Sequence, residues 1–134
     1  MSMSSLAAFA GRVALAAIFL MSGLAKLADP AATAAAVGST GLPMPQLLAW
    51  AATAVEIVGS VALIAGFQTR LAAFGLAGFS ILAALLFHFD FADRMQAIQF
   101  MKNVAIAGGL LQVVAFGAGA ISLDARSARR PAST

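Results

Sequence analysis

Four long apolar segments alternate with short polar ones along this chain. They cover about residues 6–28, 46–67, 70–90 and 98–121. Each has the roughly 20 residues that a helix needs to cross the hydrocarbon core of a membrane. Alanine and leucine dominate these segments, and apolar and polar residues do not alternate, which argues against strands. The pattern predicts an all-α integral membrane protein, with a four-helix transmembrane bundle in a single domain, residues 1–124.

The polar joints predict where the helices stop. Asp29 precedes Pro30, and a proline both displaces its predecessor from the α region and interrupts the helical hydrogen bonds. Residues 31–40, AATAAAVGST, are expected to form a short surface or re-entrant segment between the first two spans. Residues 41–45, GLPMP, form a rigid turn before the second span. The polar end of the chain, residues 125–134, predicts a basic, disordered cytoplasmic tail.

Composition identifies lipid as the main solvent. Of the 134 residues, 62% are hydrophobic and 10% charged, whereas about 25% are charged in an average soluble domain. The chain has no cysteine, which excludes disulfides, thiolate metal sites and a cysteine nucleophile. One histidine argues against a metal centre, so no metal site is expected. The basic residues are scattered, so the net charge of +3 indicates membrane topology rather than nucleic-acid binding.

The positions of lysine and arginine predict the orientation. With four spans, the two termini and the tight turn between the second and third spans, FQTR at residues 67–70, share one side of the membrane. That side holds Arg12, Arg70, Arg126, Arg129 and Arg130. The other side holds Lys26, Arg94 and Lys102. Because basic residues are enriched in cytoplasmic segments, both termini are predicted to be cytoplasmic, N-in and C-in.

Several ionisable residues lie inside the predicted spans. At a rise of about 1.5 Å per residue, Glu56 falls near the midplane, and Arg12 roughly 8 Å toward the cytoplasm. Lys26, His88 and Lys102 each fall roughly 9–13 Å toward the opposite side, on three different helices. An unpaired carboxylate at the midplane is strongly disfavoured. A structural ion pair of Arg12 with Glu56 is therefore predicted, with Lys26 as the alternative partner.

The polar residues that share this depth, with Glu56 deeper in the membrane, predict a ligand-binding pocket open toward the outer side. The expected set is Lys26, Glu56, His88, Lys102 and Asn103. Other interpretations remain open. His88 at a helix end often hydrogen-bonds its own loop, here through Asp90, and Lys26 can extend to the membrane surface. If Asp90 and Asp93 fold back onto His88 and Lys102, the cluster is a structural cap and not a site.

Five segments in this order resemble the DoxX family of small bacterial membrane proteins. They are GRVALAAIFLMSGLAKLADP, GLPMP, VEIVGSVALIAGFQTRLAA, FHFDF with QFMKNVAIAGGLLQ, and GAGAISLD. The resemblance extends from about Arg12 to Asp124. It implies a multi-pass, four-helix protein of the bacterial inner (plasma) membrane. The recurrent polar positions of the family fall here on Arg12, Lys26, Glu56, His88, Lys102 and Asn103.

The resemblance also implies an association with oxidoreductases. One branch of the family is linked to thiosulfate:quinone oxidoreductase, and another to a membrane complex with superoxide dismutase and a sulfurtransferase. A quinone held without a covalent bond is then the expected ligand, and an oxidoreductase subunit the expected partner, with no catalytic residue in this chain. The alternative is a lipid- or anion-binding protein, or a scaffold, without redox chemistry. A transporter would require a homo-oligomer, because four short helices form a thin wall.

The predicted orientation can be tested by cysteine labelling, since the chain has no cysteine of its own. Ala128→Cys should react with a membrane-impermeant maleimide only after the cytoplasmic side is exposed. Phe91→Cys, in the opposite loop, should react in intact spheroplasts. Labelling of position 128 from the periplasm would reverse the assignment.

Overall fold

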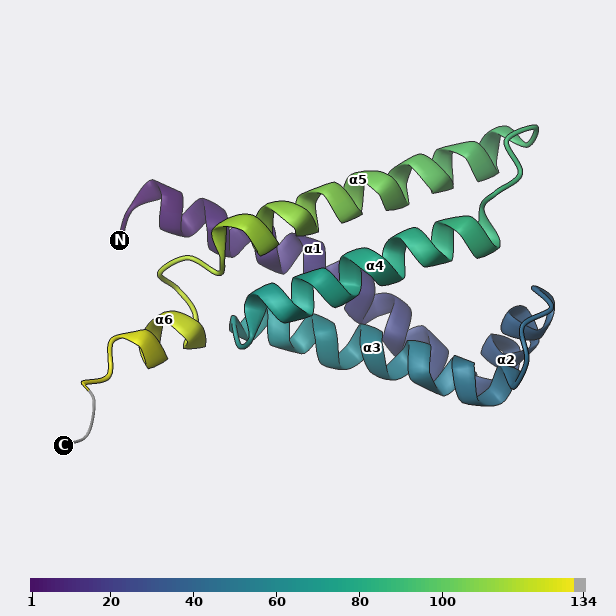
Figure 1. Cartoon of the computed structure of the whole chain (residues 1–134), viewed down its shortest axis with the longest axis horizontal. Helices are drawn as coiled ribbons and strands as arrows, with labels where there is room; N and C mark the ends of the chain where they lie inside the picture. The colour runs from purple at the N-terminus through teal and green to yellow at the C-terminus, as the bar shows by residue number, and fades with distance from the viewer. Residues whose placement is uncertain (132–134) are drawn as a thin grey trace.

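The computed structural model describes residues 1–131. Within this range every regular element is a helix (Figure 1). The helices are α1 (Met3–Ala28), α2 (Pro30–Gly38), α3 (Pro45–Ala65), α4 (Thr69–Phe87), α5 (Arg94–Phe116) and α6 (Leu123–Ala128). Four of them, α1, α3, α4 and α5, are long and apolar enough to cross a membrane. The predicted all-α fold with four membrane-spanning helices is confirmed.

The boundaries of α5 differ from the predicted segment at both ends. The helix begins earlier because the side chain of Asp93 accepts a hydrogen bond from the Met95 amide at 2.9 Å, which caps the first turn. It ends at Phe116 because Gly117 has a φ of 80°, a backbone conformation that glycine adopts without strain. The chain after Phe116 therefore leaves the helix and turns across the bundle.

The four long helices form two antiparallel pairs. Helix α3 packs along α1, with α2 between them in sequence, and α5 packs along α4. Helices α3 and α4 contact each other less extensively. Both termini lie at one end, the termini end, and α2 and the α4–α5 loop lie at the other, the loop end (Figure 1). The two pairs lie close together at the termini end and diverge toward the loop end (Figure 1).

Small residues allow the helices to approach closely. A Cβ atom at Gly23 of α1 would lie 2.7 Å from the Cγ1 atom of Ile57, so α1 and α3 touch there. A Cβ atom at Gly59 of α3 would lie 3.0 Å from the side chain of Leu76 in α4. Such contacts are typical of helices packed in membranes, where close van der Waals contact replaces the hydrophobic driving force.

The apolar core fills the middle of the bundle and its termini end. Its buried members are Ala16, Phe19, Leu63, Ala73, Leu76, Ala77, Ala107 and Leu110. The outer surfaces of the helices are also apolar, and large side chains such as Val58, Leu71 and Phe74 are exposed on them. These surfaces fit contact with lipid chains, as the composition predicts.

Three phenylalanines pack together at the loop end of α4 and α5. The rings of Phe89, Phe91 and Phe100 meet edge to face, with centroids 5.0 to 6.1 Å apart. Aromatic pairs of this geometry stabilise a fold beyond the area that they bury. The cluster fixes the α4–α5 loop and, with it, the position of His88.

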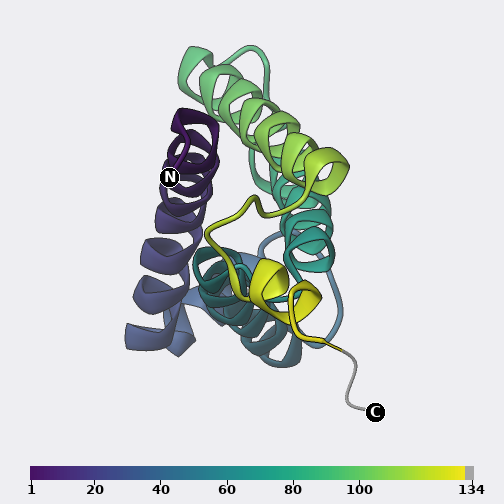
Figure 2. The ribbon, with the colours of Figure 1, turned by 90° about the vertical axis from the view of Figure 1, so that its left-hand side faces the viewer.

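The segment of residues 117–124 crosses the termini end between the two helix pairs (Figure 2). Arg12 is buried in α1, and its Nη2 atom donates a hydrogen bond to the carbonyl oxygen of Ile121. The amide of Asp124 donates to the carbonyl oxygen of Gly66, at the C-cap of α3. We call this segment, with its contacts to α1, α3 and α4, the C-terminal clasp.

Asp124 caps the start of α4. Its carboxylate accepts hydrogen bonds from the amides of Gln68 and Thr69, both at 2.9 Å, and from the Thr69 hydroxyl. Burial raises the pKa of Asp124, but the hydrogen bonds of Thr69 and Gln68, together with the charge of Arg12, lower this pKa overall below its ordinary value. Folding therefore favours the ionised form of the Asp124 carboxylate.

The chain after the clasp is partly helical. Residues 125–128, which the sequence predicts to be disordered, belong to α6, whose first turn is capped by the Ser122 hydroxyl. The clasp holds the start of α6 against the bundle, which explains the difference. Residues 132–134 of the predicted tail lie outside the described residues.

The C-terminal clasp predicts a pH-dependent contribution to stability. Asp124→Ala removes the cap of α4 and should lower the free energy of unfolding by about 1–2 kcal/mol. Because the folded pKa is lowered, this advantage of the wild type is fully present above the unfolded pKa. It should shrink as the pH falls below about 4. Thermal unfolding in detergent at a series of pH values measures it.

Asp90→Ala is the matched control, since Asp90 is exposed and, within residues 1–131, its side chain accepts a single hydrogen bond, from the Ala92 amide at 3.2 Å. An equal loss of stability in both variants would contradict a special role of the clasp.

Candidate functional site

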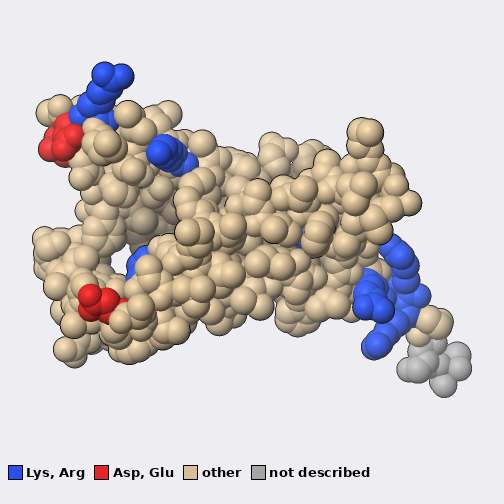
Figure 3. All heavy atoms as spheres, turned by 180° about the vertical axis from the view of Figure 1, so that it is seen from behind, with Lys and Arg blue, Asp and Glu red and all other residues tan. Residues whose placement is uncertain are grey.

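A cavity of about 800 Å³ lies between the two helix pairs in the loop-end half of the molecule. Its walls come from all four long helices and from α2. Figure 3 shows the hollow between the two pairs, at the end opposite the basic C-terminal residues. Most of its walls are apolar. Its polar members are Ser22, Lys26, Asp29, Thr33, Glu56, Ser80, His88 and Asn103.

An ion pair of Lys26 and Glu56 lies on the wall of this cavity. The Nζ atom of Lys26 is 2.5 Å from Oε1 of Glu56 and donates a hydrogen bond to the Ser22 hydroxyl at 2.7 Å. Glu56 is only 1% exposed, as predicted for a carboxylate near the midplane. The Oε1 atom makes no aligned hydrogen bond among the described residues, so the contact with Lys26 is a charge pair.

The partner of Glu56 is therefore Lys26, and the predicted pair of Arg12 with Glu56 does not form. Gly23 brings α1 against Glu56 and Ile57 of α3, and Lys26 lies one turn further along α1. Arg12 is eleven residues before Gly23, which is roughly 16 Å along the helix. Its guanidinium instead faces the C-terminal clasp. Two of its nitrogen atoms, Nε and Nη1, have no hydrogen-bond partner among the described residues.

His88 lines the loop end of the cavity. It is the C-cap residue of α4 and lies beyond the helix, whereas the sequence places it inside a span. Its Nδ1 atom lies 3.0 Å from the side-chain oxygen of Gln96 in α5, within hydrogen-bonding distance. Of the predicted competitors, Asp90 instead accepts a hydrogen bond from the Ala92 amide of its own loop, and Asp93 accepts one from the Met95 amide in the first turn of α5. The two aspartates therefore do not cap the cluster.

Asn103 reaches the cavity while joining α5 to α4. Its Nδ2 atom donates to the carbonyl oxygen of Ser80 at 3.1 Å, and the Ser80 hydroxyl donates to the carbonyl oxygen of Asn103 at 3.0 Å. This reciprocal pair fixes the rotation of α5 about its own axis. Successive residues of a helix are about 100° apart, so Lys102 points elsewhere.

Lys102 is exposed and does not line the cavity. The sequence places it at the same depth as Lys26 and His88, but depth does not determine rotation. The structure thus brings together Lys26, Glu56, His88 and Asn103, and leaves Lys102 outside.

The predicted set omits Ser22, Asp29, Thr33 and Ser80, which line the cavity, and Gln96, which contacts His88. Ser80 lies alone in an apolar segment, and Gln96 lies in a stretch predicted to be loop. Neither Ser80 nor Gln96 belongs to a periodic pattern of polar residues in the sequence. Gln96 meets His88 only because of the geometry of the α4–α5 loop. By contrast, Ser22 lies four residues before Lys26, the spacing at which helix side chains meet.

The charged side chains that line the cavity give it no net positive charge. Lys26 is paired with Glu56, and Asp29, which caps α2 through the Ala32 amide at 3.1 Å, adds a further negative charge at the wall. With Lys102 turned away, the cavity carries no excess of positive charge. A neutral ligand with hydrogen-bonding oxygens therefore suits it better than an anion.

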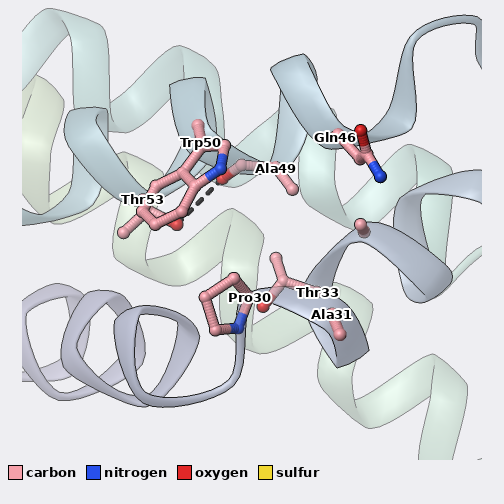
Figure 4. Close-up of a pocket in the computed structure, with 8 residues that line it drawn as sticks. Pro30, Ala31, Thr33, Gln46, Ala49, Trp50 and Thr53 are labelled. Atoms are coloured by element: carbon pink, nitrogen blue, oxygen red, sulfur yellow. Dashed lines mark hydrogen bonds between the residues drawn. The ribbon is translucent and has the colours of Figure 1, made fainter.

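A second, smaller cavity of about 270 Å³ lies between α2 and α3 (Figure 4). Trp50, Pro30 and Thr33 line it. Its polar groups are few, and the Thr53 hydroxyl is already bonded to the Ala49 carbonyl of its own helix at 2.8 Å. Among the residues that the structure describes, no ionisable side chain lines it. The larger cavity is therefore the candidate site.

The fold and this site define a class of small integral membrane proteins, with four spanning helices and a polar cavity between two helix pairs. The sequence profile of the DoxX family matches residues 7–89. The inner membrane protein YqjF of Escherichia coli K12 is 35% identical over 116 residues, 84% of this chain and 85% of the relative. The inner membrane protein YphA of the same organism is 34% identical over 120 residues, 86% of each chain. No solved structure matches this chain significantly.

The chain belongs to the DoxX family. It is a multi-pass protein of the inner membrane, because both relatives are named inner membrane proteins and four of its helices are long and apolar enough to span a membrane. The predicted family and location are confirmed.

The ion pair predicts strong coupling between Lys26 and Glu56. Lys26→Met and Glu56→Gln should each lower the stability in detergent, because each leaves the other group unpaired in an apolar environment. The double variant should lose less than the sum, with a coupling of about 1–3 kcal/mol. Thermal unfolding of the four proteins completes this double-mutant cycle.

Lys102→Met combined with Glu56→Gln is the control cycle and should be additive. Coupling of Glu56 to Arg12 that exceeds its coupling to Lys26 would refute the assigned pair.

Proposed function

We propose that the cavity binds the ring of a quinone, or a similarly small lipid-soluble molecule with carbonyl oxygens. In this proposal the chain serves as a membrane subunit of an oxidoreductase. The observation that carries it is the Lys26–Glu56 pair on the wall of a cavity of about 800 Å³ between membrane-spanning helices. Ionisable groups inside a membrane are costly and usually serve a function. The volume lies within the range of about 300–1,000 Å³ that is usual for ligand pockets.

The wall offers donors that match carbonyl oxygens. The Lys26 ammonium has three protons, of which Ser22 accepts one and Glu56 faces another, so a third is free for a ligand. Reduction of a quinone places negative charge on its oxygens and requires protons. Lys26 would stabilise that charge, and Glu56 or His88 would exchange the protons.

The electrons would come from a partner protein or a second substrate. The chain has no cysteine, and the described residues contain no cluster of three or more potential metal ligands. The contribution of this chain would then be to bind the ligand, orient it and exchange protons.

The alternative is binding of an anionic lipid headgroup, or a scaffold role without chemistry. The pairing of Lys26 with Glu56 and the orientation of Lys102 weigh against an anion, since no uncompensated positive charge faces the cavity. The experiment below separates the two ligand classes.

Thermal-shift titration of the purified protein tests the proposal. A short-chain benzoquinone should raise the melting temperature of the wild type, and phosphatidic acid should not. Ala52→Trp fills the cavity beside Glu56 and should weaken the apparent quinone affinity at least about tenfold, or 1.4 kcal/mol. Ala54→Trp places the same ring on the exposed face of α3 and should leave the affinity unchanged.

Stabilisation by phosphatidic acid alone would favour the lipid-binding alternative. Stabilisation by neither compound, or an equal loss in the two tryptophan variants, would reject a quinone site in this cavity.

A further inference from the structure

The cavity is not closed toward the surrounding lipid. Val55 of α3 and Leu82 of α4 line it, yet they are 40% and 54% exposed. A side chain that both lines a cavity and is exposed lies at its rim. Helices α3 and α4 touch where Leu76 packs on Gly59 and diverge beyond that contact toward the loop end (Figure 1). The rim of Val55 and Leu82 therefore borders a lateral opening between α3 and α4.

This opening is apolar along its length. Leu48 and Leu86 line the cavity on the same two helices, and both lie near the rim residues in sequence. The charged pair lies deeper, since Glu56 is fully buried and Lys26 reaches it from α1. A path from lipid into the cavity thus passes apolar side chains first and polar groups afterwards.

We propose that the ligand enters sideways from the bilayer and is an amphiphile with a hydrocarbon tail. Its small neutral head lies at Lys26 and Glu56, and its tail passes out between Val55 and Leu82 into the lipid. This inference rests on the proposed function for the nature of the head. The order of polar and apolar groups along the path matches the order in such a molecule. A tail in this opening exchanges lipid contacts for contacts with apolar side chains, so it needs no desolvation of polar groups.

Another exposed residue of the cavity wall, Ile18 of α1, marks the other side of the hollow. The lining residues contributed by α5, Asn103 and Ile106, are only partly exposed. The α3–α4 opening is the better exit for a tail, because both of its helices present exposed apolar side chains there.

The test compares two benzoquinones with the same substituted ring, one without a tail and one with a decyl tail. In the double variant Val55→Trp/Leu82→Trp, bulky rings narrow the opening without reaching the polar groups. The affinity for the decyl compound should fall about tenfold, and that for the tail-less compound should change less than about twofold. The control, Val58→Trp/Leu85→Trp, places the same rings on exposed positions outside the cavity and should change neither.

Cysteine protection gives a second measurement that does not depend on the tryptophan variants. The decyl compound should slow the reaction of Val55→Cys with a lipid-soluble maleimide, and it should leave Val58→Cys unaffected. Protection of Ile18→Cys in place of Val55→Cys would overturn the assigned opening.

The outcomes separate the two proposals. If neither quinone binds the wild type, the proposed function is rejected, and entry of the ligand through the α3–α4 opening is rejected as well. If both bind and the rim variant weakens them equally, or weakens neither, the quinone site stands and the lateral tail is refuted.

Discussion

Lipid offers no hydrogen bonds and little compensation for charge, so every polar group within the spans must find its partner in the protein. This constraint connects features that look separate in the sequence. Glu56 pairs with Lys26, Arg12 donates to the carbonyl of Ile121, and Asn103 exchanges hydrogen bonds with Ser80. Each contact joins two different elements of the fold. The polar groups, few as they are, determine which helix faces meet.

These contacts divide the molecule into two unlike halves. At the termini end, the clasp closes the space between the helix pairs, and Asp124 ties it to the start of α4. At the loop end, α1 meets α3, and α4 meets α5, but the two pairs stand apart around the cavity. A bundle fastened at one end can keep an open volume at the other without losing its fold.

The sequence was sufficient for the spans and insufficient for the contacts between them. Hydropathy and length predict the four spanning helices, because membrane thickness sets both. The burial of Glu56 also followed from its depth. Its partner did not, because the choice between Arg12 and Lys26 depends on the register at Gly23. Depth likewise grouped Lys102 with His88, although helix rotation separates them. The GAGAISLD segment contributed to the family resemblance, but its role as a clasp was not predicted, since a short Gly-rich segment reveals its contacts only in the folded chain.

The reciprocal bond of Ser80 and Asn103 has a consequence for the range of ligands that this architecture can accept. Lys102 and Asn103 are adjacent on α5, and the rotation of the helix determines which of the two side chains lines the cavity. The hydrogen bonds between Asn103 and Ser80 of α4 set this rotation, so that the neutral amide of Asn103 faces the cavity. A relative with the two residues exchanged would keep the same spans, the same depth profile and the same composition. Its cavity would nevertheless carry one more positive charge, so charge selectivity in this architecture can change while hydropathy stays constant.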